Sequence, residues 1–184
     1  MRMDRESDPD RMDMGVGRPG MTEPSRWWSP LGVSVALFLV IGGLWLFVGA
    51  LSFPLHRRGA GAQYVFVSAR ADTAYFGRSP SELVGSDPAF DKLRTMMIAV
   101  IAGLLLLAGA TFVFVSWFGL RNGSTWALAS LSLGGLLAIA LWVFALLPYV
   151  KAGVRLTLAD VPPFMWVPAI LLVPATILGW LGLK

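Results

Sequence analysis

The chain has 184 residues, of which 56% are hydrophobic, and its 15 basic and 11 acidic side chains give a formal net charge of +4. Soluble domains are about 45 to 50% apolar, so this composition indicates one compact membrane domain, whose scattered basic residues do not point to nucleic acid. The absence of cysteine and the single histidine, His56, exclude disulfides, thiol redox catalysis and paired axial haem ligands, so we expect no cofactor and no metal.

The N-terminal residues 1–26 form a polar tail with five arginines and six acids, which we expect to be disordered because it has little apolar surface to bury. Four segments without any charged residue follow, at residues 31–53, 96–120, 125–150 and 164–183. About 20 apolar residues cross a hydrocarbon core of about 30 Å. Residues 27–184 therefore predict an all-α membrane protein with four transmembrane helices in an antiparallel bundle and a small structured loop, residues 54–95, between helices 1 and 2.

Local signals mark the ends of these spans. Trp27 and Trp28 suit the interface before the first span, which we expect to end at Pro54. Asp87 and Pro88 predict an N-cap and a first helical residue, so the second helix begins outside the membrane, with Lys92 and Arg94 extending to the boundary. Six residues, 119–124, join the second and third spans, which predicts an antiparallel hairpin. The prolines of the fourth span predict a bent helix whose freed carbonyl groups find partners on neighbouring helices.

The first loop has the local patterns of a folded segment. Residues 63–68 alternate and are rich in Tyr, Val and Phe, which predicts a short strand. Ser79, Pro80 and Glu82 fit a capping box with proline at the first helical position, which predicts a short helix.

Small residues at four-residue spacing mark surfaces where membrane helices approach closely, because lipid tails are as apolar as leucine and close packing must hold the helices together. We interpret these positions as packing within the chain, with a homodimer contact as the alternative: Gly32 and Ala36, Ala99 and Gly103, Ser130, Gly134 and Ala138, Ala175 and Gly179.

The first and third loops emerge on the same face of an antiparallel bundle and bring most polar chemistry together. The residues concerned are His56, Arg57, Arg58, Arg70, Asp72, Tyr75, Arg78, Lys151, Arg155 and Asp160. A basic concavity roofed by Tyr75 and Phe76 would hold a phosphate or carboxylate headgroup, since arginine offers bidentate donors to such groups. The alternative is a solvated face on which Asp160 pairs with an arginine or caps a turn before Pro162. His56 is either a pH-sensitive base or, beside two arginines, an ordinary interfacial residue.

The spans contain no ionisable residue, and such residues are the usual marks of proton relays and ion pathways inside a membrane. A proton-coupled exporter would need a membrane-embedded acid. An intramembrane serine protease would need its serine beside a base, but Ser124 lies on the opposite face from His56. We therefore identify no catalytic residues.

Short motifs carry one resemblance. The hairpin at residues 119–127, Tyr75-Phe76-Gly77, Glu82-Leu83 and Asp87-Pro88 are similar to patterns in uncharacterised bacterial four-span membrane proteins, loosely the DoxX-like group. The resemblance covers roughly residues 27–184. It implies the four-span architecture and no catalytic residues.

Together these observations favour a non-enzymatic accessory or interaction component of the bacterial inner membrane, in contact with the lipid bilayer and with a membrane protein partner or a second copy of itself. The alternative is a lipid-headgroup or small-amphiphile binding protein, either a carrier or a membrane enzyme, that uses the basic face of loops 1 and 3. Basic residues counted over the whole chain do not decide between the two orientations, but those near the span ends gather on the side of these loops, which favours placing that side in the cytoplasm and both termini outside.

Overall fold

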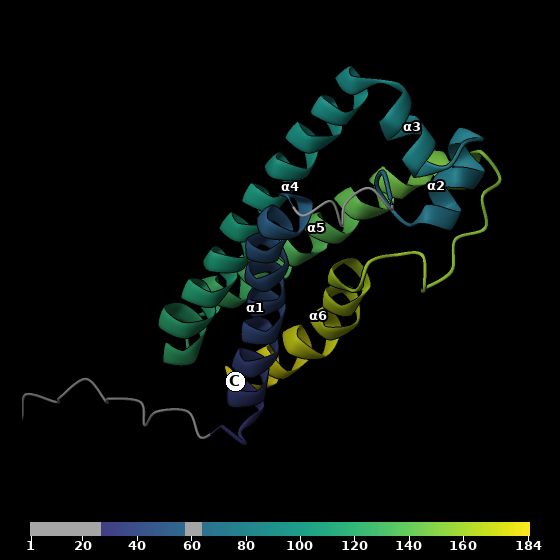
Figure 1. Ribbon diagram of the computed structural model, residues 1–184. Coiled ribbons are helices and arrows are strands. Elements are labelled where there is room, and N and C mark those ends of the chain that lie inside the picture. Colours follow the sequence, from purple (N-terminus) through teal and green to yellow (C-terminus); the bar gives the residue numbers. More distant parts are fainter. Residues whose placement is uncertain (1–26, 58–63) are drawn as a thin grey trace, which may run out of the picture.

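The computed structural model describes residues 27–57 and 64–184. The helices, in chain order, are α1 (Pro30–Arg57), α2 (Ala69–Phe76), α3 (Pro80–Ser86), α4 (Pro88–Phe114), the π-helix η2 (Val115–Gly119), the 3-10 helix η3 (Leu120–Asn122), α5 (Thr125–Lys151) and α6 (Pro163–Gly182) (Figure 1). Four of these segments are long and apolar enough to cross a membrane: α1, α4 with η2 and η3, α5, and α6. The predicted all-α bundle of four spans is therefore confirmed, whereas the predicted tail, residues 1–26, lies outside the described residues.

Helix α1 occupies the centre of the bundle and packs against α4 and α6, while α5 packs against α6 (Figure 1). Its inner face carries Val35, Phe38, Ile41 and Trp45, whose spacing of three to four residues aligns them on one side of a helix. The rest of the buried cluster comes from the other spans and the hairpin: Leu105, Phe112, Leu120, Ala127, Leu128, Leu131, Leu172 and Ala175.

Glycines bring α1 and α4 into backbone contact. A Cβ atom added to Gly109 would lie 2.6 Å from the backbone nitrogen of Leu46 and 2.7 Å from the carbonyl oxygen of Gly42. Further along, a Cβ atom on Gly49 would lie 2.9 Å from the carbonyl oxygen of Ala102. The sequence predicted a close approach through Gly103 instead, but that residue is exposed and has no neighbour within 4 Å of its Cβ position.

Two polar side chains of α1 bond to backbone carbonyl groups of α6 inside the bundle. Because Pro168 has no N–H, the carbonyl oxygen of Phe164 loses its partner within α6, and the indole Nε1 of Trp45 donates to it at 3.0 Å. The hydroxyl of Ser34 donates to the carbonyl oxygen of Ala175 at 2.6 Å. These two bonds attach α1 to α6, and the first is the kind of neighbour contact expected for a proline in a membrane helix.

The hairpin between α4 and α5 remains helical almost to its turn. The chain passes from α-helix to π-helix at Val115 and ends in a 3-10 turn at Asn122, followed by Gly123 with a φ of 76°. A Cβ atom on Gly119 would lie 2.7 Å from that of Ala127, so glycine is needed for this close return. The predicted antiparallel hairpin is confirmed.

The described part of the loop between α1 and α4, residues 64–87, folds, but not entirely as predicted. The capping box is present: Ser79 Oγ accepts from the N–H of Glu82, and Glu82 accepts from the N–H of Ser79. Asp87 caps α4 and Pro88 is its first residue, also as predicted. The prediction of a strand at residues 63–68 is wrong for the described part, residues 64–68, which has no strand geometry. This segment leads instead into α2, a helix that the sequence analysis did not predict and that Ser68 caps.

We predict that Gly109→Ala destabilises the bundle and that Gly103→Ala does not. The methyl group at position 109 would overlap the backbone of α1, and overpacking of this kind costs about 1 to 3 kcal/mol. Both variants remove one glycine from the same helix, so the second controls for helix propensity. Unfolding in mixed micelles by denaturing detergent measures the difference in stability between the two variants. Equal stability would contradict the close contact between Gly109 and the backbone of α1.

Candidate functional site

Asp160 joins the third loop to α2. Its carboxylate accepts hydrogen bonds from Arg70 Nε at 2.9 Å, from Ser68 Oγ at 2.9 Å, and from Thr157 through N–H at 2.9 Å and Oγ1 at 2.7 Å. Arg70 Nη2 contacts the same carboxylate, which completes a two-pronged ion pair. Hydrogen bonds from Arg70 and then from Thr157 hold the pKa of Asp160 well below its usual range, so Asp160 is ionised at neutral pH.

A second carboxylate, Asp72, is fully buried. It binds the backbone N–H groups that the predicted strand would have offered to a neighbouring strand. It accepts from the backbone N–H groups of Val65, Phe66 and Val67 at 2.5, 3.0 and 3.3 Å. The hydroxyl of Tyr149, near the end of α5, donates to it at 2.7 Å. The carboxylate therefore gathers three consecutive peptide donors that a strand would offer to a neighbour, and it ties the first loop to α5.

The predicted loop face divides into separate parts. Arg70 and Asp160 form the ion pair described above, and Arg70 also donates to the carbonyl oxygen of Arg155 at 2.9 Å. Asp160 thus pairs with an arginine and caps a turn before Pro162, as the structural alternative predicted. Two further members, Arg78 and Lys151, are exposed.

The remaining members of this face are placed less fully. Tyr75 stacks on Tyr149 with ring centroids 4.5 Å apart, beside buried Asp72. His56 and Arg57 lie in the last turn of α1 but their side chains are outside the described residues, as is Arg58 entirely. A ligand-binding role for this face stays a prediction.

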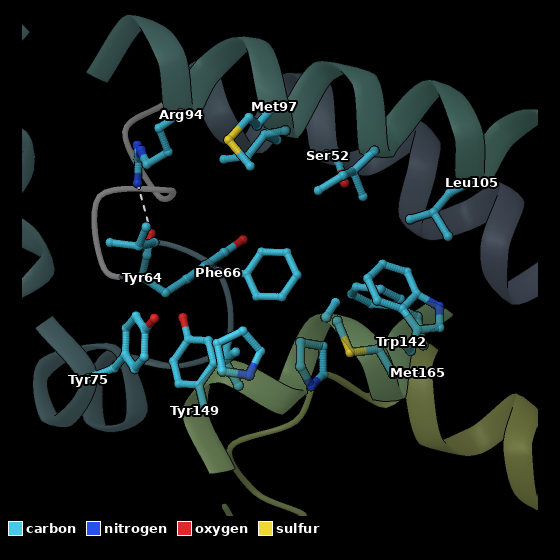
Figure 2. A pocket seen from close by; sticks show the side chains of 18 of the residues that line it. Ser52, Tyr64, Phe66, Tyr75, Arg94, Met97, Leu105, Trp142, Tyr149 and Met165 are labelled. Atoms are coloured by element: carbon cyan, nitrogen blue, oxygen red, sulfur yellow. Dashed lines mark hydrogen bonds between the residues drawn. The ribbon is translucent and has the colours of Figure 1, made fainter. Parts of the chain in front are cut away.

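A cavity of about 550 Å³ lies beneath these loops, among α1, α4, α5 and α6 (Figure 2). Most of its wall is apolar, formed by Val48, Phe66, Phe90, Met97, Ile98, Ile101, Leu105, Trp142, Phe164 and Met165 among others. Its polar groups include Ser52, Tyr64, Tyr75, Arg94 and Tyr149. In Figure 2, Arg94, Tyr64, Tyr75 and Tyr149 occupy one end and Leu105, Trp142 and Met165 the other, so the cavity is amphipathic.

The arrangement of the helices explains where the cavity lies. Helices α4 and α5 meet at their hairpin and separate toward the loops, and α2 and α3 lie across the open end (Figure 1). A Cβ atom added to Gly134 on α5 would lie 3.5 Å from the ring of Phe112 on α4, so the two helices pack closely near the hairpin. Beyond that level the space between α4 and α5 is left to the cavity and to the loop residue Phe66, whose ring projects into it (Figure 2).

Arg94 is the site residue that the sequence interpretation misplaced. We expected it to extend to the membrane boundary, but its side chain is only 6% exposed and faces the cavity. Its Nη1 donates to the carbonyl oxygen of Tyr64 at 2.9 Å, and its Nη2 lies 3.6 Å from Asp91 Oδ1. A signal was present in the sequence, because Arg94 lies on one helical stripe with the cavity-lining residues Phe90, Met97, Ile98, Ile101 and Leu105.

The described residues contain no group of three or more His, Asp or Glu side chains that would hold a metal ion. The cavity end offers hydrogen bonds and one guanidinium, an arrangement that orients the polar group of a ligand. Comparisons with protein-family models, curated proteins and solved structures found no match to the chain. The resemblance to DoxX-like proteins stays a prediction.

We predict that Asp160→Asn lowers the Tm by several degrees at neutral pH and that the deficit narrows in acid. The folded protein holds the pKa of this carboxyl below its ordinary value of 3.8, so the ionised form adds stability above that pH and the contribution is lost as the pH falls below it. Thermal unfolding in detergent across this pH range measures the effect.

Asp87→Asn is the matched control for that experiment, since asparagine caps a helix as well as aspartate does and the charge change is the same. If the Tm of Asp160→Asn stayed below that of the wild-type protein by the same amount throughout the acidic range, the lowered pKa of Asp160 would be contradicted.

Proposed function

We propose that the chain is a multi-pass membrane protein that binds a small amphiphile in the cavity beneath its loops. The observation that carries the proposal is the amphipathic lining: apolar walls along the membrane-spanning helices and polar groups gathered at the end beside the loops. An amphiphile in a bilayer has the same polarity profile along the membrane normal. A ligand could therefore enter the cavity without turning over.

The size of the cavity suits such a ligand. Small-molecule sites have volumes of about 300 to 1,000 Å³, are mostly apolar and use a few placed polar groups to fix orientation. The volume of about 550 Å³ lies in this range. The outward faces of α4 and α5 near the cavity are apolar, with Val100, Leu104 and Leu141 at least 60% exposed, which keeps lipid next to the space between the two helices.

Binding without chemistry agrees with the leading interpretation of the sequence, a non-enzymatic accessory component that acts with a partner or a second copy. The cavity adds support for the second interpretation, amphiphile binding, and moves its location from the basic loop face to the space below. The apolar walls and the single guanidinium among the described lining residues favour a carrier or sensor of an amphiphile over an enzyme.

We expect Ala145→Phe to reduce the amount of amphiphile that co-purifies with the protein. Ala145 lines the cavity, so a phenyl ring there occupies ligand volume. Ala140→Phe makes the same change on an exposed, outward position of the same helix and should retain the ligand. Solvent extraction and mass spectrometry of protein purified in a mild detergent would compare the two. Equal lipid profiles, with both proteins folded, would refute a ligand in this cavity.

We propose further that the protein lies in a bacterial cytoplasmic membrane with both termini outside. Among described residues, the loop side carries Arg57, Arg70, Arg78, Lys92, Arg94, Lys151 and Arg155, whereas the hairpin side carries Arg121 and Lys184. Cytoplasmic loops are enriched in basic residues, which supports this orientation.

A reporter fused after Lys184 tests the orientation. Alkaline phosphatase, which is active only outside the cytoplasm, should be active in that position, and green fluorescent protein exported through the general secretion route should be dark. A fluorescent fusion with inactive phosphatase would place the C-terminus in the cytoplasm and reverse the assignment. Fusions after Gly123, in the hairpin on the same side, should behave in the same way as those after Lys184.

A further inference from the structure

We infer that the cavity takes its ligand sideways from the membrane leaflet on the loop side, through an opening between α4 and α5. The inference rests on the proposed amphiphile-binding function and names the source of the ligand, an amphiphile dissolved in that leaflet. It depends on which lining residues also face outward, on their chemistry and on their depth.

Six of the described lining residues are also exposed on the outside of the protein, which marks the rim of an opening. The rim comes from α4, from the first loop with α2, and from α5, and its members are Leu93, Met97, Tyr64, Tyr75, Phe76 and Pro148. At the other end of the cavity, Leu105 and Met165 are buried. The opening therefore lies at the loop end of α4 and α5 and not near the hairpin (Figure 2).

The packing of the helices leaves this opening in place. Helix α4 packs on α1, and α5 packs on α6. The close approach of α4 and α5 at Phe112 and Gly134 lies near the hairpin, and from there the two helices diverge toward the loops (Figure 1). Met97 on α4 and Pro148 on α5 therefore belong to two separate edges of the opening.

The chemistry of the rim suits lipid better than water. Its six residues are apolar or aromatic, and none is charged. An opening to water would hydrate this surface at a cost of about 25 cal/mol per Å² of apolar area, whereas lipid tails are as apolar as leucine. Arg94, which is buried behind the rim, donates to the carbonyl oxygen of Tyr64 and so fixes this part of the rim.

The depth of the rim matches the boundary between headgroups and acyl chains. Leu93 directly follows Lys92, and Pro148 precedes Lys151 by three residues, so both lie beside the basic residues at the ends of their spans. Met97 lies four residues beyond Leu93, about 6 Å deeper at about 1.5 Å per residue. The polar group of an amphiphile therefore stays among the headgroups while its chain passes the rim into the apolar part of the cavity.

Photolabelling from one leaflet tests the inference on the wild-type protein. The probe is lysophosphatidylcholine with a diazirine in its acyl chain, added to the outer leaflet of proteoliposomes, where its charged headgroup slows crossing. A tag after Lys184 is cut by added protease only in molecules whose termini face outward, so affinity capture separates the two orientations. We expect the cavity-lining residue Ile101 to be labelled severalfold more in molecules with an intact tag. Equal labelling in both orientations would overturn the inference.

A pair of variants tests the position of the opening. Met97→Trp narrows the rim and should lower the early labelling of Ile101 severalfold, with a final yield that approaches the wild-type value. Met96→Trp makes the same change at the preceding residue, which is 67% exposed and does not line the cavity, and should label at the wild-type rate. Equal early rates for the two variants would contradict entry at this rim.

Ala145→Phe separates this inference from the proposed function. It should remove the label from Ile101 and leave it on Val100, which faces outward on the same helix. If Ala145→Phe removes the label but the wild-type protein is labelled equally from both leaflets, entry from the loop-side leaflet is wrong and amphiphile binding stands. If Ala145→Phe leaves Ile101 labelled as in the wild-type protein, both are wrong.

Discussion

The close backbone approach of α1 and α4 at Gly42 and Gly109 is the contact on which the bundle depends. Helices surrounded by lipid gain little from hiding apolar surface from one another, so close packing and buried hydrogen bonds must hold them together. Helix α1 makes such contacts with α4 through glycine and with α6 through Ser34 and Trp45. Helix α5 is held mainly at the hairpin and by α6, and it is therefore able to diverge from α4. The cavity follows from this unequal division of contacts.

The sequence predicted those parts of the fold that are set by local chemistry. Span positions follow from apolar length, and the starts of α3 and α4 follow from Ser79 and Asp87, whose side chains bond within three residues. The strand prediction failed because the donors of residues 65–67 bind Asp72, a single side chain that alternation in the sequence cannot reveal. The small-residue pattern identified the kind of contact on α4 but not its face, since Gly103 and Gly109 differ only in what lies opposite them.

The candidate site was predicted less well than the fold because its charges are paired in ways that sequence position does not determine. Asp160 and Arg70 are distant in the chain, and their ion pair turns part of a predicted basic surface into an internal support for the loops. From the sequence, Arg94 was expected to lie at the membrane boundary. In the structure, α4 and α5 separate, and the buried side chain of Arg94 lines the cavity between them. Two buried or nearly buried carboxylates, Asp72 and Asp160, thus hold the loops over the cavity.

The hydrogen bond from Trp45 to the carbonyl oxygen released by Pro168 also fixes how far α6 can slide along α1. A shift of α6 by one helical turn would leave that oxygen, and the indole N–H, unpaired in hydrocarbon, where each costs several kcal/mol. Phe164 and Met165, which line the cavity, are therefore held at a constant depth. A proline that weakens its own helix thereby acts as an axial stop, which keeps the cavity-lining start of α6 in register with α1.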